Sequence, residues 1–560
     1  MRASVNCSGE KRKGWPSLRV ALPLGLLAVS FLAYVLPLVL RCTNNLRLIG
    51  TFNFDEATAV DIVMDMVAAR SLLPASESVY GGMYFYVGYA FVSLVGMIVG
   101  QITVPHVIVS LRLVAALSGL LCILLTYVLA KKMYDAGVAF LGAAFLAVTP
   151  IFLRWSVSAH PDTLQVLFTI ACVYCCYLLT QSYSVKNLVL ASAMAGLSFG
   201  TKRVGFILVP VVLLACLLSL LAQRRRTTQA LGWRTLVCRF IIGSAIAGLV
   251  FASVFIITSP TVITQYDQFR ARLLTEEERL ACGVEGLHTN ALRWLQVLAQ
   301  DRVMTGFELA LIGACMVTVT LSLLRERGRG FFNHASGPSV VVAGAALFLL
   351  YLSLEICVYY PRYVLPILPF LVIFASFAAF YFIRLNAPHR LLAYSLKVAV
   401  ICGVLLAFWP KITFALTFFT ETLDKMNDSR VVAGQWLEAN FPPDTVITYD
   451  KGAYIPPAFE AAYISWGQTV EFVTQHEPGV IVVYDEVRQR FTTPEEGLGY
   501  VDDAELSWQA WSFYSQLESG DLPCFQLVQA FDRIRIYSRE ESCSLEPEHM
   551  GAALTQGCVS

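Results

Sequence analysis

The sequence predicts an all-α polytopic membrane protein with a small α/β domain at its C-terminal end. Hydrophobic residues make up 57% of the 560 residues, mean hydropathy is +0.63, and only 14% of the residues are charged. Apolar stretches recur up to about residue 420, and about 20 such residues span the hydrocarbon of a bilayer. The net charge of +1 implies no nucleic-acid partner. The lipid bilayer is therefore the first partner that the composition indicates.

The N-terminal segment is expected to be a retained signal anchor. A basic stretch from Lys11 to Arg19 precedes an apolar run from about residue 20 to 40. The run is long for a signal peptide and lacks a clear small-residue cleavage site. Residues 1–19 are therefore predicted to lie in the cytoplasm, because basic flanks stay on that side.

Twelve apolar segments divide the predicted membrane domain, residues 20–419. They are 20–40, 84–104, 107–130, 136–153, 163–181, 187–200, 203–222, 236–257, 303–324, 338–358, 363–383 and 391–418. The positive-inside rule places Arg224–Arg226 and the cluster Arg325–Arg329 in the cytoplasm. Eleven crossings satisfy these signals, so one early segment is expected not to cross fully. The candidates are the break at Gly200–Arg203 and the region 107–153.

This arrangement puts two long loops, 41–83 and 258–302, on the extracytoplasmic side together with residues 420–560. The C-terminal part is less hydrophobic, and it contains strand-like runs at Thr445–Thr448 and Val480–Tyr484. It is therefore predicted to be a soluble extracytoplasmic α/β domain, with a helix over Val431–Ala439. Three cysteines there could form a disulfide in an oxidising compartment: Cys524, Cys543 and Cys558.

The acidic pair Asp55–Glu56 follows the first span and is the main candidate for chemistry. Carboxylates at a membrane surface are costly unless they face water, a cation or a substrate. Such a carboxylate could act as a general base on a hydroxyl, or the pair could hold a divalent metal. The structural alternative is that Asp55 caps an amphipathic helix over 55–72, which lies along the interface and ends at Pro74.

Polar breaks in the apolar sequence are further candidates. His160 and Asp162 could bind a metal or orient a substrate, although Asp162 could simply begin the next helix. Lys202 and Arg203 could bind a phosphate headgroup, or they could snorkel from a cytoplasmic turn.

Arg362, within Tyr359–Tyr363, begins a span on the outer side, where arginine is disfavoured. A phosphate, or a carboxylate such as Glu355, would explain it, whereas Tyr363 and its neighbours alone would form an aromatic belt. Arg112 and Arg154 fit interfacial anchors near span ends.

Together these features resemble the GT-C superfamily of integral-membrane glycosyltransferases, and within it the protein O-mannosyltransferase and aminoarabinose-transferase group. The resemblance covers about residues 20–420. The motifs that carry it, besides the acidic pair, are Tyr84-Phe85-Tyr86, Arg112, Thr149-Pro150 with Asp162, Ala195–Lys202 and Arg362–Pro366.

The resemblance implies a single inverting transfer from a polyprenyl-phosphate sugar to an acceptor lipid, glycan or protein. The site would face outward from a plasma membrane or into the lumen from an ER membrane. Asp55 would be the general base, and Glu56 would orient the acceptor or its loop. Lys202 and Arg362 would hold the donor phosphate. The other expected substrate-binding residues are Tyr84, His160, Asp162, Arg203 and Tyr363. No cofactor is implied beyond the divalent metal considered above.

The chain departs from the family pattern at one place, and several other functions remain open. Many relatives carry Lys-Pro before the second span, where this chain has Gly81-Gly82. A transporter or flippase of lipid-linked sugars would also bury charges among its spans. An oligosaccharide ligase would transfer a larger glycan, and a scaffold or receptor would work through residues 420–560.

Overall fold

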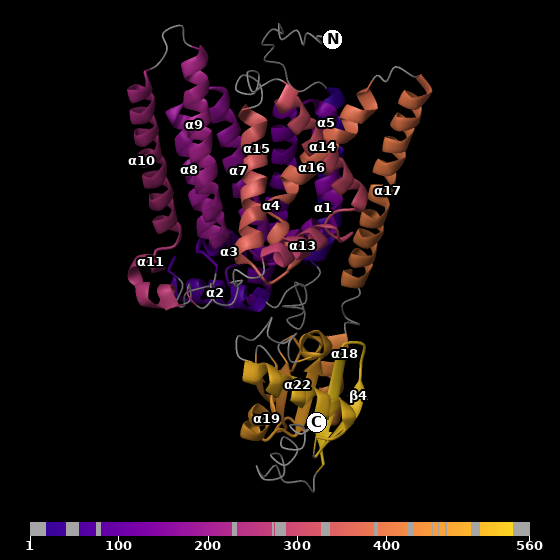
Figure 1. The fold of residues 1–560 in the computed structure, drawn as a ribbon. Coiled ribbons are helices and arrows are strands. Elements are labelled where there is room, and N and C mark those ends of the chain that lie inside the picture. The colour runs from indigo at the N-terminus through magenta and orange to yellow at the C-terminus, as the bar shows by residue number, and fades with distance from the viewer. Residues whose placement is uncertain are drawn as a thin grey trace.

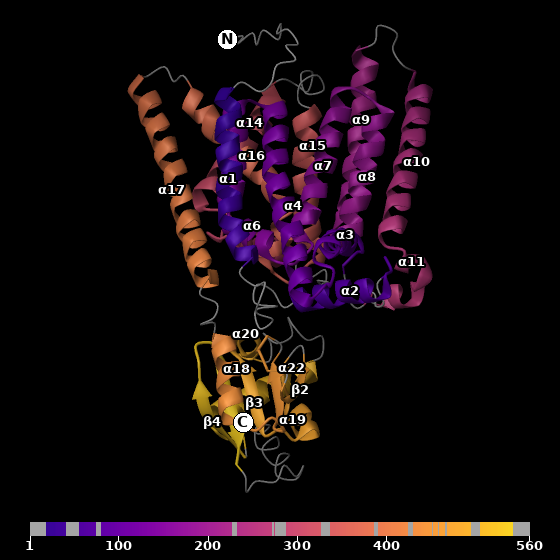
Figure 2. The same ribbon diagram turned by 180° about the vertical axis from the view of Figure 1, so that it is seen from behind.

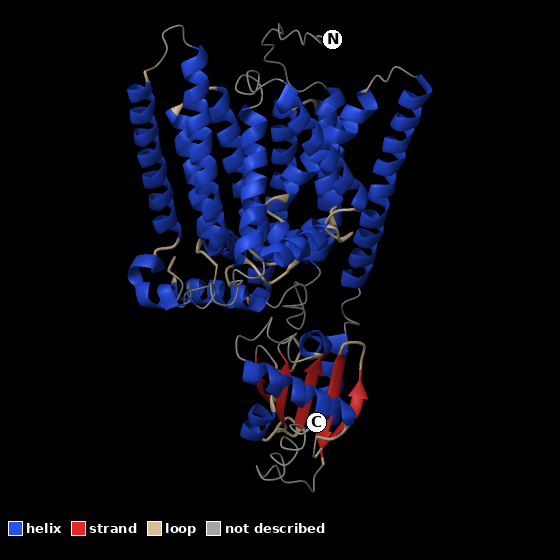
Figure 3. Cartoon of the chain, in the orientation of Figure 1, coloured by secondary structure: helices blue, strands red, loops and turns tan. Residues whose placement is uncertain are grey.

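A helical bundle and a smaller sheet-containing domain make up the molecule (Figure 1). The computed structural model describes residues 18–40, 55–73, 80–226, 232–271, 274, 287–325, 336–385, 390–423, 429–450, 452–456, 458–464, 467–493, 504–522 and 524–540. All strands in these ranges belong to the smaller domain (Figure 3). Most of the basic N-terminus, Pro74, most of the Arg325–Arg329 cluster, Cys543 and Cys558 lie outside the described residues.

The bundle alternates long helices with short interfacial ones. Its first half contains α1 (Leu18–Leu40), α2 (Asp55–Ala69), α3 (Met83–Val99), α4 (Val104–Met133), α5 (Ala136–Val148), α6 (Pro150–Val157), α7 (Asp162–Gln181), α8 (Val185–Thr201), η2 (Arg203–Ile207) and α9 (Leu208–Arg226). Its second half contains α10 (Trp233–Thr258), α11 (Thr261–Thr264), α13 (Leu287–Leu298), α14 (Gly306–Arg325), α15 (Ser336–Glu355), η5 (Pro361–Val364), α16 (Leu368–Arg384) and α17 (Arg390–Leu423).

Seven described helices are long and apolar enough to cross a membrane, and an eighth span is possible if α5 and α6 are counted together. These two helices meet at an angle of 62°, where Pro150 begins the second one and removes a backbone donor. Three more apolar helices in the described ranges are shorter: α3, the first part of α14, and α16. The expectation of eleven crossings therefore stays a prediction, while the helical membrane fold is plain.

Helix α3 is the best candidate for the apolar segment that does not cross. Figures 1 and 2 place it beside α2, at the end of the bundle that faces the smaller domain. The Gly200–Arg203 break instead forms the turn from α8 into η2 and α9. This turn lies at the same end of the bundle as Asp55. The cytoplasmic turn considered for Lys202 and Arg203 would need the opposite end, where α9 ends and α10 begins (Figure 1).

A buried ion pair ties α17 to the rest of the bundle. Lys411 Nζ donates to Glu308 Oε1 at 2.8 Å and to Thr149 Oγ1 at 3.1 Å. Glu308 also accepts from the backbone N–H of Thr305, at the start of α14. Because charges among spans are costly unless paired, this pair acts as an anchor. It holds the break between α5 and α6, and α6 lies next to the site described below.

The smaller domain is built on a five-stranded sheet with the order β2-β1-β3-β5-β4. Its strands are β1 (Val446–Asp450), β2 (Glu460–Ile464), β3 (Val480–Tyr484), β4 (Phe525–Ala530) and β5 (Ile534–Arg539). Its helices are α18 (Ser429–Asn440), α19 (Val470–His476), α20 (Asp485–Arg488), the short 3-10 helix η7 (Gln489–Phe491) and α22 (Ala504–Ser519). β2, β1 and β3 run parallel, whereas β5 is antiparallel to β3 and β4. The runs Thr445–Thr448 and Val480–Tyr484, expected as strands, correspond to β1 and β3.

Candidate active site

Glu56 anchors the interfacial helix α2 inside the bundle. Arg112 of α4 donates through Nε to Glu56 Oε1 at 3.0 Å and through Nη2 to Oε2 at 2.6 Å. Glu56 Oε1 also accepts from the backbone N–H of Ala159 at 2.7 Å. Both side chains are fully buried, and bidentate pairs of this kind fix geometry as well as charge. Three segments are thereby joined at the first turn of α2.

Asp55, one residue earlier, points away from Glu56 toward Arg362, and its side chain is 29% exposed. Its Oδ2 accepts a hydrogen bond from the Tyr80 hydroxyl at 2.8 Å and from Arg362 Nη1 at 3.4 Å, and His160 Nε2 lies 3.5 Å away. Burial alone would raise the pKa of Asp55. The contacts with His160, Arg362 and Tyr80 outweigh it and hold the pKa well below its ordinary value. Asp55 is therefore an ionised carboxylate with a path to solvent.

A row of charged and polar groups continues inward from Tyr80. The Tyr80 hydroxyl lies 2.8 Å from His160 Nε2, while His160 Nδ1 lies 2.6 Å from Asp162 Oδ2. The other oxygen of Asp162 accepts from Lys202 Nζ at 2.6 Å. His160 and Asp162 are almost fully buried, and Lys202 is 13% exposed. The expected substrate-binding residues His160, Asp162 and Lys202 thus lie together, although they also bind one another.

Arg362 lies in an aromatic setting beside this row. Its guanidinium carbon is 5.3 Å from the ring centroid of Trp155, and the rings of Tyr360 and Tyr363 are at 5.2 and 5.7 Å. Lys202 Nζ is 5.0 Å from the Tyr363 ring. The carboxylate that pairs with Arg362 is Asp55, rather than the Glu355 considered from the sequence. Cation–π contacts hold the guanidinium while leaving some of its donors for a further ligand.

The segment that carries Arg362 is held by the interfacial helix α13. Trp294 Nε1 donates to the Ile356 carbonyl at 3.0 Å, and Asn290 Nδ2 donates to the Ser353 carbonyl at 2.7 Å. The Trp294 ring also packs on Tyr359, with centroids 5.4 Å apart. The loop 258–302 therefore helps to position the arginine of the site.

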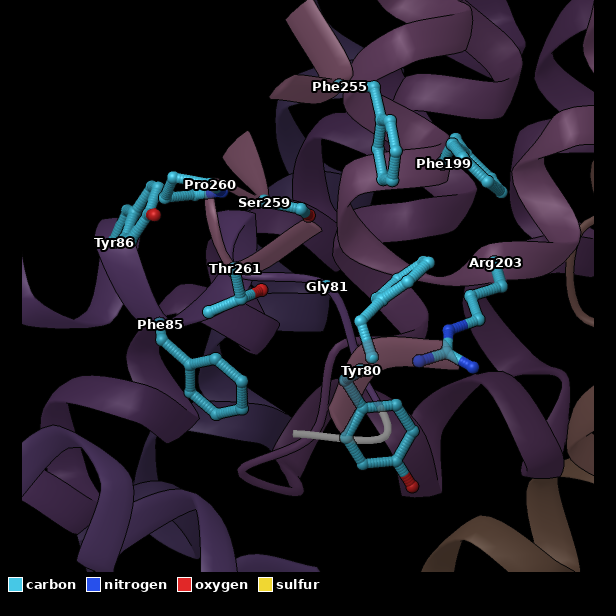
Figure 4. Close-up of a pocket in the computed structure, with 12 residues that line it drawn as sticks. Tyr80, Gly81, Phe85, Tyr86, Phe199, Arg203, Phe255, Ser259, Pro260 and Thr261 are labelled. Atoms are coloured by element: carbon cyan, nitrogen blue, oxygen red, sulfur yellow. The ribbon is translucent and has the colours of Figure 1, made fainter. Parts of the chain in front are cut away.

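A pocket opens next to Tyr80, and Arg203 is the charged residue in its lining (Figure 4). Aromatic side chains line much of it, and the guanidinium carbon of Arg203 lies 4.9 Å from the Phe269 ring. Figure 4 shows this guanidinium group turned toward Tyr80. The buried Ser259 hydroxyl also lines the pocket and has no hydrogen-bond partner among the described residues. The pocket therefore combines an aromatic lining with one cation, next to Tyr80.

The two glycines before α3 allow close packing at the edge of this pocket. A Cβ atom at Gly81 would lie 2.1 Å from the Gly200 carbonyl oxygen, and one at Gly82 would lie 2.4 Å from the Thr258 carbonyl oxygen. A side chain at either position would need the backbone of α8 or α10 to move. The departure from Lys-Pro therefore has a steric basis in this chain.

Tyr84 lies away from the pocket lining. It is fully buried, and its hydroxyl donates to the Leu111 carbonyl at 3.2 Å. This position supports a packing role, and the substrate-binding role expected for Tyr84 stays a prediction without support from its contacts.

The carboxylates of the site are already engaged by cations. Asp55 pairs with Arg362, Glu56 with Arg112, and Asp162 with Lys202. Among the described residues, no group of three or more His, Cys, Asp or Glu side chains could hold a metal ion. These contacts do not fit a metal site, so no step below uses one, and the divalent metal stays a prediction.

The sequence did not indicate Tyr80 or Trp155 as site residues, and it gave Arg112 as an interfacial anchor and as one motif of the resemblance, without a partner. Tyr80 directly precedes the glycine pair and is the last polar residue before the second apolar segment, which was an available signal. Arg112 and Trp155 lie inside apolar runs, where nothing local distinguishes a buried partner from an interfacial anchor.

Solved structures of glycosyltransferases share this fold. The structure of ArnT from Cupriavidus metallidurans bound to undecaprenyl phosphate matches with a TM-score of 0.50 and 14% identity over 94% of this chain and 98% of that chain. The Archaeoglobus fulgidus oligosaccharyltransferase with Zn and sulfate matches with a TM-score of 0.51 and 12% identity over 87% and 70%. The same oligosaccharyltransferase tethered to an acceptor peptide matches with a TM-score of 0.51 and 11% identity over 88% and 72%.

The chain is therefore an integral membrane protein with the fold of the GT-C glycosyltransferases, and the resemblance expected from its motifs is confirmed. Residues 84–261 match the family model of dolichyl-phosphate-mannose-protein mannosyltransferases. No curated protein matches the sequence significantly.

Proposed function

We propose that this protein is an inverting glycosyltransferase that moves a sugar from a polyprenyl-phosphate donor to an acceptor hydroxyl or amine. The acceptor would belong to a lipid, a glycan or a protein. The observation that carries the proposal is Asp55, an ionised and partly exposed carboxylate beside Arg362, at the end of the bundle where the pocket opens. The family match over residues 84–261 and the undecaprenyl phosphate bound to ArnT support a lipid-phosphate donor.

Asp55 would act as the general base of a single displacement. The acceptor O–H bond breaks as its oxygen bonds to the anomeric carbon, and the proton goes to Asp55. The bond from that carbon to the phosphate oxygen breaks on the opposite side, and its electron pair leaves with the lipid phosphate. A phosphate already carries negative charge well, so the leaving group needs little help from an acid.

Cations at the membrane interface would stabilise that developing charge. Arg362 lies next to Asp55, Lys202 lies on its inner side, and Arg203 lines the pocket. Preorganised cations in a site with little water contribute strongly to catalysis.

The disulfides support an extracytoplasmic site. Cys357, in the segment before Arg362, and Cys524, in the smaller domain, are both disulfide-bonded. Disulfides persist in oxidising compartments, and both cysteines lie on the side of the bundle that carries Asp55. We therefore infer a plasma membrane with the site outside, or an ER membrane with the site in the lumen.

Sugar transfer in membranes that contain the protein tests this function. A panel of radiolabelled polyprenyl-phosphate sugars is offered to the wild type, to Asp55→Asn, and to Asp65→Asn as a control on the exposed face of the same helix. Transfer should fall at least about 100-fold in Asp55→Asn, as expected for loss of a general base, and stay at the wild-type level in Asp65→Asn. Equal rates in all three would remove Asp55 from the mechanism.

The transporter or flippase alternative predicts a different result. Folded wild-type protein would then transfer no sugar from any donor, but it would move a fluorescent lipid-linked sugar between the leaflets of proteoliposomes. That outcome would overturn the glycosyltransferase proposal.

A further inference from the structure

The Tyr80 hydroxyl lies between two groups that can each accept its proton. Asp55 Oδ2 and His160 Nε2 are both 2.8 Å from this oxygen. Tyr80 carries a single hydroxyl proton, so it can donate to only one of them at a time. Two hydrogen bonds therefore need one proton more than Tyr80 supplies.

The extra proton can lie at either end of this row without movement of a heavy atom. If it lies on Asp55, then Asp55 donates to Tyr80 and Tyr80 donates to His160. If it lies on His160, then His160 Nε2 donates to Tyr80 and Tyr80 donates to Asp55. The two arrangements differ only by a shift of two protons along contacts of 2.8 Å.

Asp162 lies beside Nδ1 of His160, on the side of the ring away from Tyr80, and would stabilise a protonated His160. His160 Nδ1 lies 2.6 Å from Asp162 Oδ2, at angles that do not make a hydrogen bond, and the negative charge of Asp162 favours a proton on this nitrogen in either arrangement. Asp162 is in turn held by Lys202 at 2.6 Å. When His160 gains a proton at Nε2, the neighbouring carboxylate stabilises the imidazolium.

Asp55 has a low affinity for the proton that it takes from the acceptor. The positive charge of Arg362 and the hydrogen bond from Tyr80 both act to lower its pKa, and a carboxylate with a lowered pKa retains a proton poorly. A neighbouring group with more affinity for the proton would complete its removal from the acceptor.

We propose that Tyr80, His160 and Asp162 form a relay that carries the acceptor proton from Asp55 to His160, an inference that rests on the glycosyl transfer proposed above. The proton taken by Asp55 moves from Oδ2 to the Tyr80 oxygen, and the Tyr80 proton moves to His160 Nε2. After the products leave, the proton returns through Tyr80 to Asp55 and passes from there to water, because Asp55 is 29% exposed whereas His160 is buried. Tyr80, His160 and Asp162 are then positioning residues that act through Asp55.

The relay needs neutral His160 at the start of each turnover. A His160 that already carries a proton on both ring nitrogens cannot accept another, so the rate should be lower in acid. Charged and titratable groups surround the row on every side. They are Asp55 and Glu56 on α2, Arg112 on α4, Asp162 on α7, Lys202 after α8, and Arg362 with Tyr363 on η5.

The test compares the pH dependence of kcat in the wild type, Tyr80→Phe, His160→Gln and the double variant, with the full chain in membranes. Tyr89→Phe is the control, because it removes a hydroxyl from the neighbouring helix α3. We expect Tyr80→Phe and His160→Gln each to lower kcat by about 100-fold, with KM for donor and acceptor unchanged. Both should lose the fall in rate at low pH, and the double variant should be no slower than the slower single variant.

Two results would overturn the relay. One is a Tyr80→Phe profile parallel to that of the wild type, which would mean that Tyr80 only holds Asp55 in place. The other is a double variant whose losses multiply. Thermal unfolding shows whether each variant is folded. If Tyr80→Phe does not fold, the pH profile of His160→Gln alone still tests the relay. A wild type that transfers no sugar would overturn the proposed function instead.

Discussion

Two adjacent acidic residues take different roles because successive helical residues point about 100° apart. Glu56 faces the bundle and is buried against Arg112, whereas Asp55 faces the site and keeps a path to solvent. The family resemblance implied a base at Asp55 and an orienting role at Glu56, but the sequence does not show which way either side chain points. In this structure Glu56 positions the helix, and Asp55 lies in the candidate site with part of its side chain exposed. The expected catalytic role of Glu56 stays a prediction, and its burial favours support over contact with a substrate.

Removal of Glu56 should cost stability before it affects chemistry. Glu56→Ala leaves Arg112 buried without its carboxylate, which costs about 3–5 kcal/mol. Thermal unfolding in detergent should show this loss, while Asp65→Ala on the exposed face of α2 should stay within about 0.5 kcal/mol of the wild type. Glu56→Ala combined with Arg112→Met should recover part of the loss. Equal unfolding temperatures for Glu56→Ala and Asp65→Ala would contradict the anchoring role.

At the scale of elements, close backbone packing joins the start of α3 to the ends of α8 and α10. The glycines at 81, 82 and 200 permit it, since an added Cβ would meet backbone or side-chain atoms within 2.4 Å at each position. Tyr80 is the residue before this contact, so the packing sets its position beside Asp55. An interfacial loop is thus held by contacts that only the folded bundle supplies.

Gly81→Ala should disturb this junction. The new methyl group would clash with the Gly200 carbonyl oxygen, and overpacking of this kind costs about 1–3 kcal/mol. We expect a lower unfolding temperature and slower sugar transfer, because Tyr80 shifts with its neighbour. Gly248→Ala is the matched control in α10, where an added Cβ meets nothing within 4 Å. If both variants behave alike, the junction does not set the position of Tyr80.

The smaller domain contains a buried carboxylate that should make its stability depend on pH. Asp450 at the end of β1 accepts from the Tyr514 hydroxyl at 2.6 Å, from Gln468 Nε2 at 3.1 Å and from the Tyr484 N–H at 2.9 Å. Burial raises the pKa of Asp450 to about 6, although these hydrogen bonds oppose the shift. The folded domain therefore binds this proton more tightly than the unfolded chain does.

Stability from this proton is fully present below about pH 4, the ordinary value of an aspartate, and is lost as the pH rises through about 6. The shift of about two units corresponds to about 3 kcal/mol. Hydrogen exchange of β1 and β3 in the full chain should be slower at pH 4 than at pH 7 after correction for intrinsic exchange. Asp450→Asn should remove this difference, and a difference that persists would assign it to another group.

At the scale of the whole molecule, the smaller domain faces the end of the bundle that carries the site (Figure 2). Arg154 of α6 is close enough to Glu486 to interact with its charge, and Trp155 next to it packs on both His160 and Arg362. The smaller domain therefore places the charge of Glu486 near Arg154, the residue before Trp155 of the candidate site.

This arrangement predicts the accessibility of two positions from opposite sides of the membrane. Ser519→Cys in the smaller domain should react with a membrane-impermeant maleimide in intact cells, or in sealed vesicles whose outer face is the lumenal face of the ER membrane. Lys186→Cys, at the start of α8 on the opposite end of the bundle, should react only after permeabilisation. Both are made in a background without the exposed Cys238 and Cys402. Labelling of Lys186→Cys alone in the intact membrane would reverse the proposed orientation.

Several conclusions follow from the sequence by itself because they depend on local composition. Runs of about 20 apolar residues define spans in any context, and basic clusters at their ends predict sidedness. The acidic pair after the first span and the ordered motifs up to Arg362 were enough to indicate the superfamily, and the runs Thr445–Thr448 and Val480–Tyr484 were enough to indicate two strands.

Only the tertiary structure decided how the polar residues combine. Asp55, Tyr80, His160, Lys202 and Arg362 come from five separated segments, and their contacts depend on helix crossings and on loops that no local pattern specifies. Which apolar segments cross the bilayer likewise depends on packing, because an apolar helix can lie along the interface or through the bilayer according to what packs against it. Long-range packing therefore turned a set of separate candidates into a site.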